Sequence, residues 1–113
     1  DIDRFKQVND RFGHLDGDKV IRRFATLLKQ AVRASDRCYR IGGDEFAALL
    51  QPATDKSALH VAKRVQQLMS DDHTLRTLKI GSSCGFSEYQ KGDTTTSLVD
   101  RADRQLYRHK RNK

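Results

Sequence analysis

Residues 40–46 read R-I-G-G-D-E-F, and they hold the residue types that most clearly suggest chemistry. Gly42 and Gly43 would let the backbone approach a ligand closely, because glycine carries no side chain. The adjacent carboxylates of Asp44 and Glu45 could together hold a divalent cation. The alternative is an ordinary glycine-rich hairpin turn whose acids are solvated. The stretch is therefore a candidate ligand and metal site.

Composition limits the classes of protein to which this chain can belong. Its 113 residues suffice for one domain with one modest core. Charged residues make up 33% of the chain and the mean hydropathy is −0.77, which predicts a hydrophilic soluble domain without a membrane span or signal peptide. Cys38 and Cys84 match no zinc spacing, and they predict reduced thiols in a cytosolic protein.

The charge of the chain favours anionic partners. Lysine and arginine exceed the acids to give a net charge of +7 and a pI near 9.7. Such a balance suits nucleotides, nucleic acid, acidic proteins or an acidic membrane surface, and the alternative is a solvated basic face. The tyrosines and phenylalanines form no stacking pattern, so we expect no nucleic-acid partner.

Apolar periodicity predicts helices alternating with strands. Amphipathic helices are expected over residues 3–12, from a cap at Asp16 or Asp18 to about residue 34, over 55–70, and from residues 94–96 onward. Strands are expected over residues 37–41, 46–50 and 78–86. This order predicts an α/β (α+β) domain with helices packed on a sheet. We also expect residues 1–113 to be one domain cut from a longer protein, without its first strand.

Four motifs in order resemble the diguanylate cyclase (GGDEF) family. G-G-D-E-F is the signature of that family, and residues 1–10 resemble its D-[IL]-D-x-F-K-x-x-N-D. Residues 12–18 resemble F-G-H-x-x-G-D, and residues 101–110 resemble R-A-D-x-x-L-Y-x-x-K. Because the matches cover nearly the whole chain, it is identified as a member of this family.

The resemblance implies a palm-like central sheet flanked by helices, similar to that of nucleotide cyclases and polymerases. It also implies condensation of two GTP molecules into cyclic di-GMP, with release of pyrophosphate and with Mg²⁺ or Mn²⁺ as cofactor. The family's metal ligands match Asp1, the carbonyl of Ile2, Asp44 and Glu45. Asp44 also matches the proposed proton acceptor, although the sequence leaves the choice between Asp44 and Glu45 open. Asp3 is either a second ligand or a helix cap.

Base selection in the family is attributed to the positions of Asn9 and Asp18. A carboxylate can accept from both N1–H and the N2 amine of guanine, whereas adenine presents an acceptor at N1. Taken alone, Asp18 would be interpreted as a helix cap and Asn9 as a surface residue. His14 lies between them and either touches the nucleotide or packs in the turn.

The family's phosphate-binding lysines match Lys6 and Lys110, which would otherwise be interpreted as solvated. Arg33 and Asp36 form an R-x-x-D motif that five residues, 37–41, separate from Gly42, as in the family's inhibitory product site. There Arg33 would contact guanine O6 and N7, Asp36 would accept from N1–H and N2, and Arg64 would assist. The alternative is a structural pair at a helix end.

The resemblance also implies partners and a setting in bacterial signalling. Since one domain holds one GTP, catalysis requires a homodimer, and an upstream sensory or regulatory domain would impose it. We expect a cytoplasmic location, either free or as the cytosolic part of a membrane-anchored sensor. The family's glycine after Lys110 is absent, which indicates a divergent or trimmed C-terminal end. The alternative function is a catalytically silent module that binds GTP or cyclic di-GMP.

Overall fold

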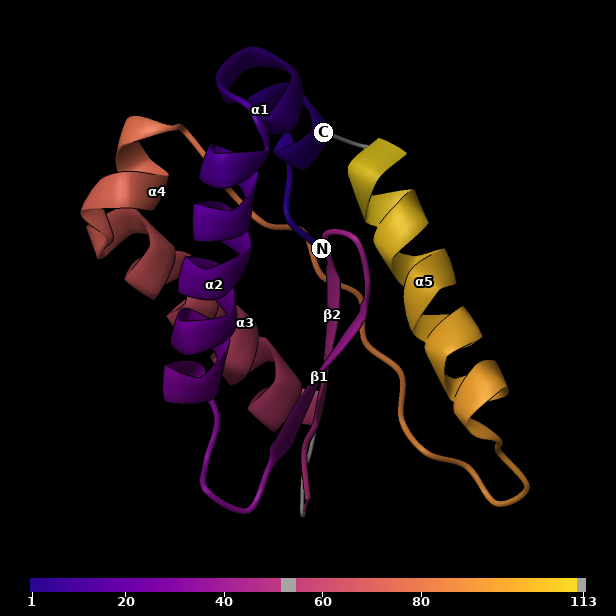
Figure 1. Ribbon diagram of the computed structural model, residues 1–113. Helices are drawn as coiled ribbons and strands as arrows, with labels where there is room; N and C mark the ends of the chain where they lie inside the picture. The colour runs from indigo at the N-terminus through magenta and orange to yellow at the C-terminus, as the bar shows by residue number, and fades with distance from the viewer. Residues whose placement is uncertain (52–54, 112–113) are drawn as a thin grey trace. The chain divides into compact units, whose positions relative to one another are not determined.

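The computed structural model describes residues 1–51 and 55–111, apart from the side chains at positions 14, 15, 55 and 109–111. In this part of the chain, five helices and one antiparallel strand pair follow one another (Figure 1). They are α1 Phe5–Phe12, α2 His14–Ala31, β1 Arg37–Gly42, β2 Glu45–Leu49, α3 Asp55–Asp71, α4 His73–Thr77 and α5 Thr95–Arg111. No described helix is long and apolar enough to cross a membrane. The chain divides into two compact units, Asp1–Ser82 and Ser83–Lys113.

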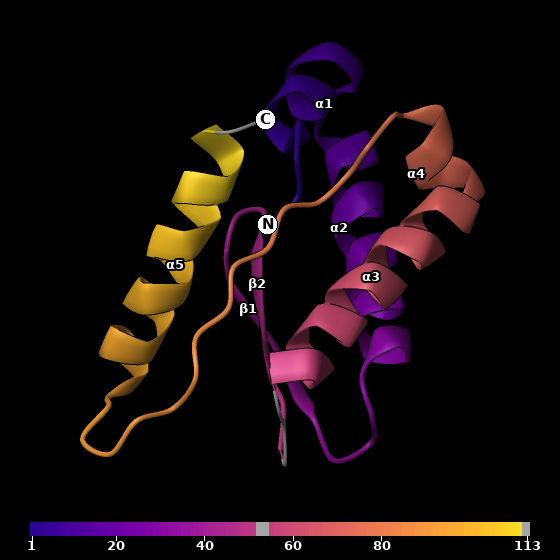
Figure 2. The ribbon, with the colours of Figure 1, turned by 180° about the vertical axis from the view of Figure 1, so that it is seen from behind.

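Helix α2 lies at the centre of the first unit. Its apolar residues recur at helical spacing and share one face, where Val20 and Phe24 are 0% and 3% exposed. Helices α1, α3 and α4 pack against α2, and α4 also packs against α3 (Figure 2). No side chain caps the start of α2, whose N-cap is Gly13. Burial of its apolar face, at about 1.5–3 kcal/mol for each large side chain, is therefore what stabilises this helix.

Strands β1 and β2 form the predicted hairpin. Its register pairs Arg37 with Leu49 and Arg40 with Phe46, and an irregularity follows between Arg40 and Gly42. The ring of Phe46 packs against that of Phe24, with centroids 5.1 Å apart. This contact anchors one face of the hairpin on α2.

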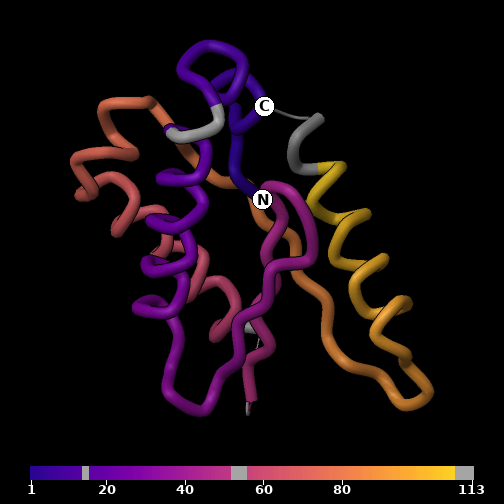
Figure 3. The backbone as a smooth tube through the Cα atoms, viewed as in Figure 1, coloured from indigo at the N-terminus to yellow at the C-terminus, as the bar shows by residue number. Residues whose placement is uncertain are grey.

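The N-terminal segment lies beside the turn of the hairpin (Figure 3). The backbone N–H of Ile2 donates to the carbonyl of Asp44 at 3.0 Å, and the N–H of Asp3 donates to the carbonyl of Gly81 at 2.9 Å. Ile2 is 1% exposed and forms a single bridge with Ser82. The first residues of the chain are therefore held by two segments distant in sequence.

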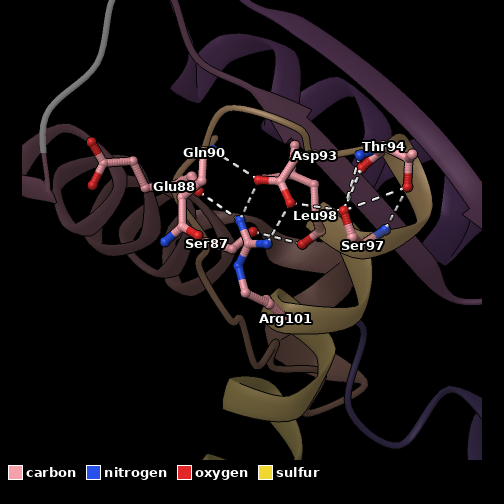
Figure 4. Close-up of polar contacts among 8 residues, drawn as sticks. All are labelled: Ser87, Glu88, Gln90, Asp93, Thr94, Ser97, Leu98 and Arg101. Atoms are coloured by element: carbon pink, nitrogen blue, oxygen red, sulfur yellow. Dashed lines mark hydrogen bonds and ion pairs between the residues drawn. The ribbon is translucent and has the colours of Figure 1, made fainter.

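The second unit consists of a loop and α5. Its segment at Gly85 lies directly on the helix, because a Cβ there would be 2.1 Å from the carbonyl oxygen of Ala102. Arg101 of α5 donates to both oxygens of Asp93 at 2.6 Å (Figure 4). The predicted apolar face of α5 is half-buried in this unit, at Leu98, Val99, Ala102 and Leu106.

The mixed α/β class is confirmed, but the strand predicted over residues 78–86 is wrong. Within the described residues, this segment has only the single bridge at Ser82. Alternating polarity specifies two faces, whereas a strand also needs a neighbour along its length to satisfy its backbone groups. The helix expected to reach residue 34 ends at Ala31, because Val32 is extended. Helix α4 was not predicted.

Candidate functional site

The G-G-D-E-F motif spans the turn between β1 and β2, from the last residue of β1 to the second residue of β2. Gly43 has a φ of 32°, in the region where residues with side chains are strained. Nε and Nη2 of Arg40 donate to the carbonyl oxygen of Gly43 at 3.0 and 2.7 Å. The carbonyl of the next residue, Asp44, accepts from Ile2. The peptide groups on both sides of Asp44 are thus held by hydrogen bonds.

All four predicted metal ligands lie on the two segments that the hydrogen bond between Ile2 and Asp44 joins. Asp1, Asp44 and Glu45 are half-buried residues, and Oδ1 of Asp1 is fully buried. Among the residues that the structure describes, no three His, Cys, Asp or Glu side chains gather closely enough to hold a metal. The fold therefore brings the backbone segments that carry the predicted ligands together.

The donor set fits Mg²⁺ or Mn²⁺ in its chemistry. Three carboxylates and the carbonyl of Ile2 offer only oxygen ligands, which these hard cations prefer. A cation beside the buried Oδ1 of Asp1 would also offset the cost of burying that charge. The N-cap of α1 is Arg4, so the capping interpretation of Asp3 is wrong, and its role as a second ligand stays a prediction.

Packing of α1 on α2 places Asn9 beside the residue that precedes Asp18. The side chain of Asn9 lies against Gly17, where a Cβ would be 1.8 Å from Oδ1 of Asn9. Gly17 is buried, Asn9 is half-buried and Asp18 is exposed. Because α2 begins after the N-cap Gly13, the capping interpretations of Asp16 and Asp18 are wrong. A glycine at position 17 is what allows the Asn9 side chain to lie against α2, one residue before Asp18.

The other predicted nucleotide contacts are only partly described. Lys6 is exposed on α1, as a lysine that reaches a phosphate would be. The side chains of His14 and Lys110 lie outside the described residues, although their backbones belong to α2 and α5.

Arg33 and Asp36 contact each other in the loop between α2 and β1. The backbone N–H of Arg33 donates to Oδ2 of Asp36 at 2.8 Å, and its Nη2 donates to Oδ1 at 3.2 Å. The backbone N–H of Gln51 also donates to Oδ1, at 3.1 Å. The Arg33 side chain, above all, and these backbone donors hold the pKa of Asp36 below its usual value. The pair therefore closes the loop and links it to the residues that follow β2.

Arg64 of α3 lies near the same helix end. Its Nε donates to the carbonyl of Gln30 in the last turn of α2, at 3.4 Å. Gln30 precedes Arg33 by three residues, so the structure brings the predicted assisting arginine to the R-x-x-D loop.

A family model described as "Diguanylate cyclase, GGDEF domain" matches residues 1–113. The chain belongs to the GGDEF family. Diguanylate cyclase DgcZ of Escherichia coli (strain K12) is 38% identical to this GGDEF domain over 117 residues, which cover 97% of the chain and 38% of DgcZ. The chain spans 22–38% of the length of five such relatives.

Solved GGDEF structures resemble this domain over its whole length. The GGDEF domain of PA1120 from Pseudomonas aeruginosa has a TM-score of 0.82 and 37% identity, and the match covers 100% of this chain and 69% of that one. DgcB from Caulobacter crescentus, in complex with c-di-GMP, has a TM-score of 0.82 and 29% identity, covering 99% of this chain and 62% of that one. The fold of this chain is therefore the mixed α/β GGDEF fold, and a homologue with this fold binds c-di-GMP.

Two contributors to the GGDEF site escaped sequence reasoning. The sequence motifs assign no role to Arg40, the first letter of the motif stretch, or to Gly17, a letter of F-G-H-L-D-G-D. An arginine directly before a glycine-rich turn is a usable signal, because its long side chain can reach carbonyls of the turn. The contact between Gly17 and Asn9 has no such signal, since it depends on how two helices cross.

Proposed function

We propose that this GGDEF domain is a diguanylate cyclase that converts two GTP molecules into cyclic di-GMP and two pyrophosphates. The observation that carries this proposal is the hydrogen bond from Ile2 N–H to Asp44 O at 3.0 Å, which joins the two acid-bearing segments. The family membership of the whole chain supports it further. We also propose that the domain has the palm-like arrangement of nucleotide cyclases and acts in the cytoplasm, where GTP is available.

In this proposal the chain's residues divide the work of binding. Asp18 accepts the N1–H and N2 donors of guanine, and Asn9 pairs with its N3/N2 side. Lys6 and Lys110 contact the phosphates, His14 contacts the nucleotide, and Gly42 and Gly43 allow its close approach to the backbone. An adenine in the same place would leave Asp18 facing an acceptor, so the site selects GTP.

The reaction forms a bond between a 3′-oxygen and an α-phosphorus and breaks the bond from that phosphorus to the β-phosphate oxygen. It occurs twice per cyclic product and releases pyrophosphate each time. Asp44 or Glu45 accepts the hydroxyl proton. Asp1, the carbonyl of Ile2, Asp44 and Glu45 would hold Mg²⁺ or Mn²⁺, which lowers the pKa of the hydroxyl and neutralises charge at the phosphates.

Two further features belong to the proposal. Each domain holds one GTP, so two copies of the domain must face each other, and a sensory or regulatory domain upstream would control that encounter.

The R-x-x-D loop, with Arg33, Asp36 and Arg64, would bind the product and inhibit the enzyme. The contact of Arg64 with the last turn of α2 supports this grouping.

The test is formation of cyclic di-GMP from GTP and Mg²⁺ by the full-length protein. We expect Glu45→Ala to lower the rate about a hundredfold or more, since a metal ligand and candidate base is lost. The chain's other glutamate gives a matched control: Glu88 is exposed in the second unit, and Glu88→Ala should keep the wild-type rate.

Two results would contradict the proposal. One is full activity in Glu45→Ala. The other is guanine-specific nucleotide binding by the wild-type protein without any product, which would identify a silent binding module instead.

A further inference from the structure

We propose that Arg40 is a positioning residue, which orients the Asp44–Glu45 acid pair through the carbonyl of Gly43. This inference rests on the proposed function, because the acid pair is assigned to metal binding and proton transfer there. The hydrogen bonds that the structure shows for the Arg40 side chain go to the carbonyl of Gly43 and not to either acid. Its effect is exerted through the backbone of the turn.

The turn needs a side chain to hold it because the strand ladder is interrupted there. Arg40 pairs with Phe46, but the next pair is Gly42 with Glu45, so Ile41 has no partner in the register. Beyond this irregularity, Gly43 adopts its positive φ of 32°. Two donors of one guanidinium, at 3.0 and 2.7 Å, meet the Gly43 carbonyl at the point where regular strand pairing ends. The side chain thus holds the turn where the strand ladder does not reach.

A second hydrogen bond, from Ile2, acts together with the Arg40 contact to fix the orientation of Asp44. Its own carbonyl accepts from Ile2, so the peptide groups before and after Asp44 are each held by a different element. With both groups held, the direction in which the Cα–Cβ bond of Asp44 leaves the backbone is set. Loss of the Arg40 contact would free the first peptide group to rotate. The acids would then be directed toward a common cation less often.

Arginine suits this task better than lysine does. Its guanidinium is planar and always charged, and adjacent donors Nε and Nη2 can share one acceptor in a fixed geometry. A lysine ammonium is a single flexible point donor. We therefore expect lysine at position 40 to replace the contact only in part.

The experiment compares Arg40→Met, which keeps side-chain length without a donor, with Arg40→Lys and wild type in the full-length protein. The matched control is Arg37→Met, which removes the same charge from the start of the same strand. Binding of Mn²⁺ is measured by electron paramagnetic resonance in the presence of GTP, and kcat for cyclic di-GMP is measured separately. Thermal unfolding reports any loss of fold.

We expect Arg40→Met to weaken Mn²⁺ binding about tenfold and to lower kcat about ten- to a hundredfold, because small misplacement of reacting groups costs rates of this order. Its KM for GTP should change little, since Asn9 and Asp18 lie on other elements. Arg40→Lys should recover part of both losses. Arg37→Met should match wild type. A purely structural Arg40 would lower the unfolding temperature without moving Mn²⁺ affinity or kcat, and this result would overturn the inference.

The readouts separate this inference from the proposed function. Wild-type protein that forms no product but loses Mn²⁺ affinity on Arg40→Met would refute the cyclase while supporting the positioning role. Product formation by wild type with equal kcat and Mn²⁺ affinity in Arg40→Met would refute the positioning role alone. If Arg40→Met does not fold, a folded Arg40→Lys with wild-type values in both measurements overturns it, and intermediate values support it.

Discussion

Arg33 has a partner within the protein, and this affects how a ligand would reach it. Its guanidinium donates to both oxygens of Asp36. A guanine that binds Arg33 must therefore compete with Asp36 for these donors. The backbone N–H groups of Arg33 and Gln51 also donate to Asp36, so its carboxylate keeps two partners once the guanidinium has left. The loop can thus release Arg33 to a ligand without losing all its internal bonds.

If this loop binds product, Arg33→Ala should raise the cyclic di-GMP concentration needed for half-inhibition about tenfold or more, because a two-pronged guanine contact is lost. The measurement is the rate of product formation at increasing cyclic di-GMP in the full-length protein. Arg22→Ala, at an exposed arginine within α2, is the control. Equal half-inhibitory concentrations in Arg33→Ala and wild type would contradict the assignment.

Helix α4 is the element that depends most visibly on a distant contact. Asp72 is its N-cap and accepts from the backbone N–H of Leu75 at 3.0 Å. Arg23 of α2, 49 residues away, donates its Nε to the same carboxylate at 3.0 Å. Burial works to raise the pKa of Asp72, but the hydrogen bonds from Arg23 and Leu75 outweigh it, so the pKa is lowered.

We expect Asp72→Ala to lower the free energy of unfolding by about 1–2 kcal/mol at neutral pH, the usual cost of losing an N-cap. Because the pKa of Asp72 is lowered in the folded state, its contribution is present above the unfolded carboxylate's pKa and is lost as pH falls through the folded value. The gap between wild type and variant should therefore narrow in acid. Urea unfolding at neutral and acidic pH measures it, with exposed Asp71→Ala as control.

An equal loss in Asp71→Ala, or a gap that persists undiminished in acid, would contradict this account of α4.

The other helices depend on local sequence more than on a distant contact. Helices α2, α3 and α5 were predicted to within a few residues, because their apolar spacing is a local property. The polarity of residues 78–86 alternates just as clearly, yet they form no strand, because a strand depends on a neighbouring strand to pair with.

At the scale of the whole molecule, the chain forms two compact units, and a polar cluster lies in the second. In the second unit, Asp93 accepts from Arg101, from the hydroxyl of Ser97 at 2.7 Å and from the backbone of Gln90 at 2.7 Å (Figure 4). The hydrogen bond from Arg101, above all, holds the pKa of Asp93 well below its usual range, and the same pair raises the pKa of Arg101. The cluster ties the loop to the start of α5.

Asp93→Asn should therefore loosen the second unit without affecting the first. We expect faster amide hydrogen exchange within residues 86–101, and unchanged exchange within residues 1–82. The difference should shrink as pH falls through the lowered pKa of Asp93, where wild type loses the same charge. Asp100→Asn, on the exposed side of α5, is the control. Equal exchange in wild type and Asp93→Asn, or faster exchange throughout residues 1–82, would contradict this division.

The sequence by itself determined the family, the three long helices, the hairpin and the acids of the candidate site. These follow from residue types and spacings within a few positions of one another, where local periodicity and turn chemistry act. Only the tertiary structure decided that Ile2 joins Asp44, that Arg23 reaches Asp72 and that Gly17 accommodates Asn9. Each of these depends on where packing places whole elements, and hydrogen bonds and close contacts form only between groups that packing has already brought together.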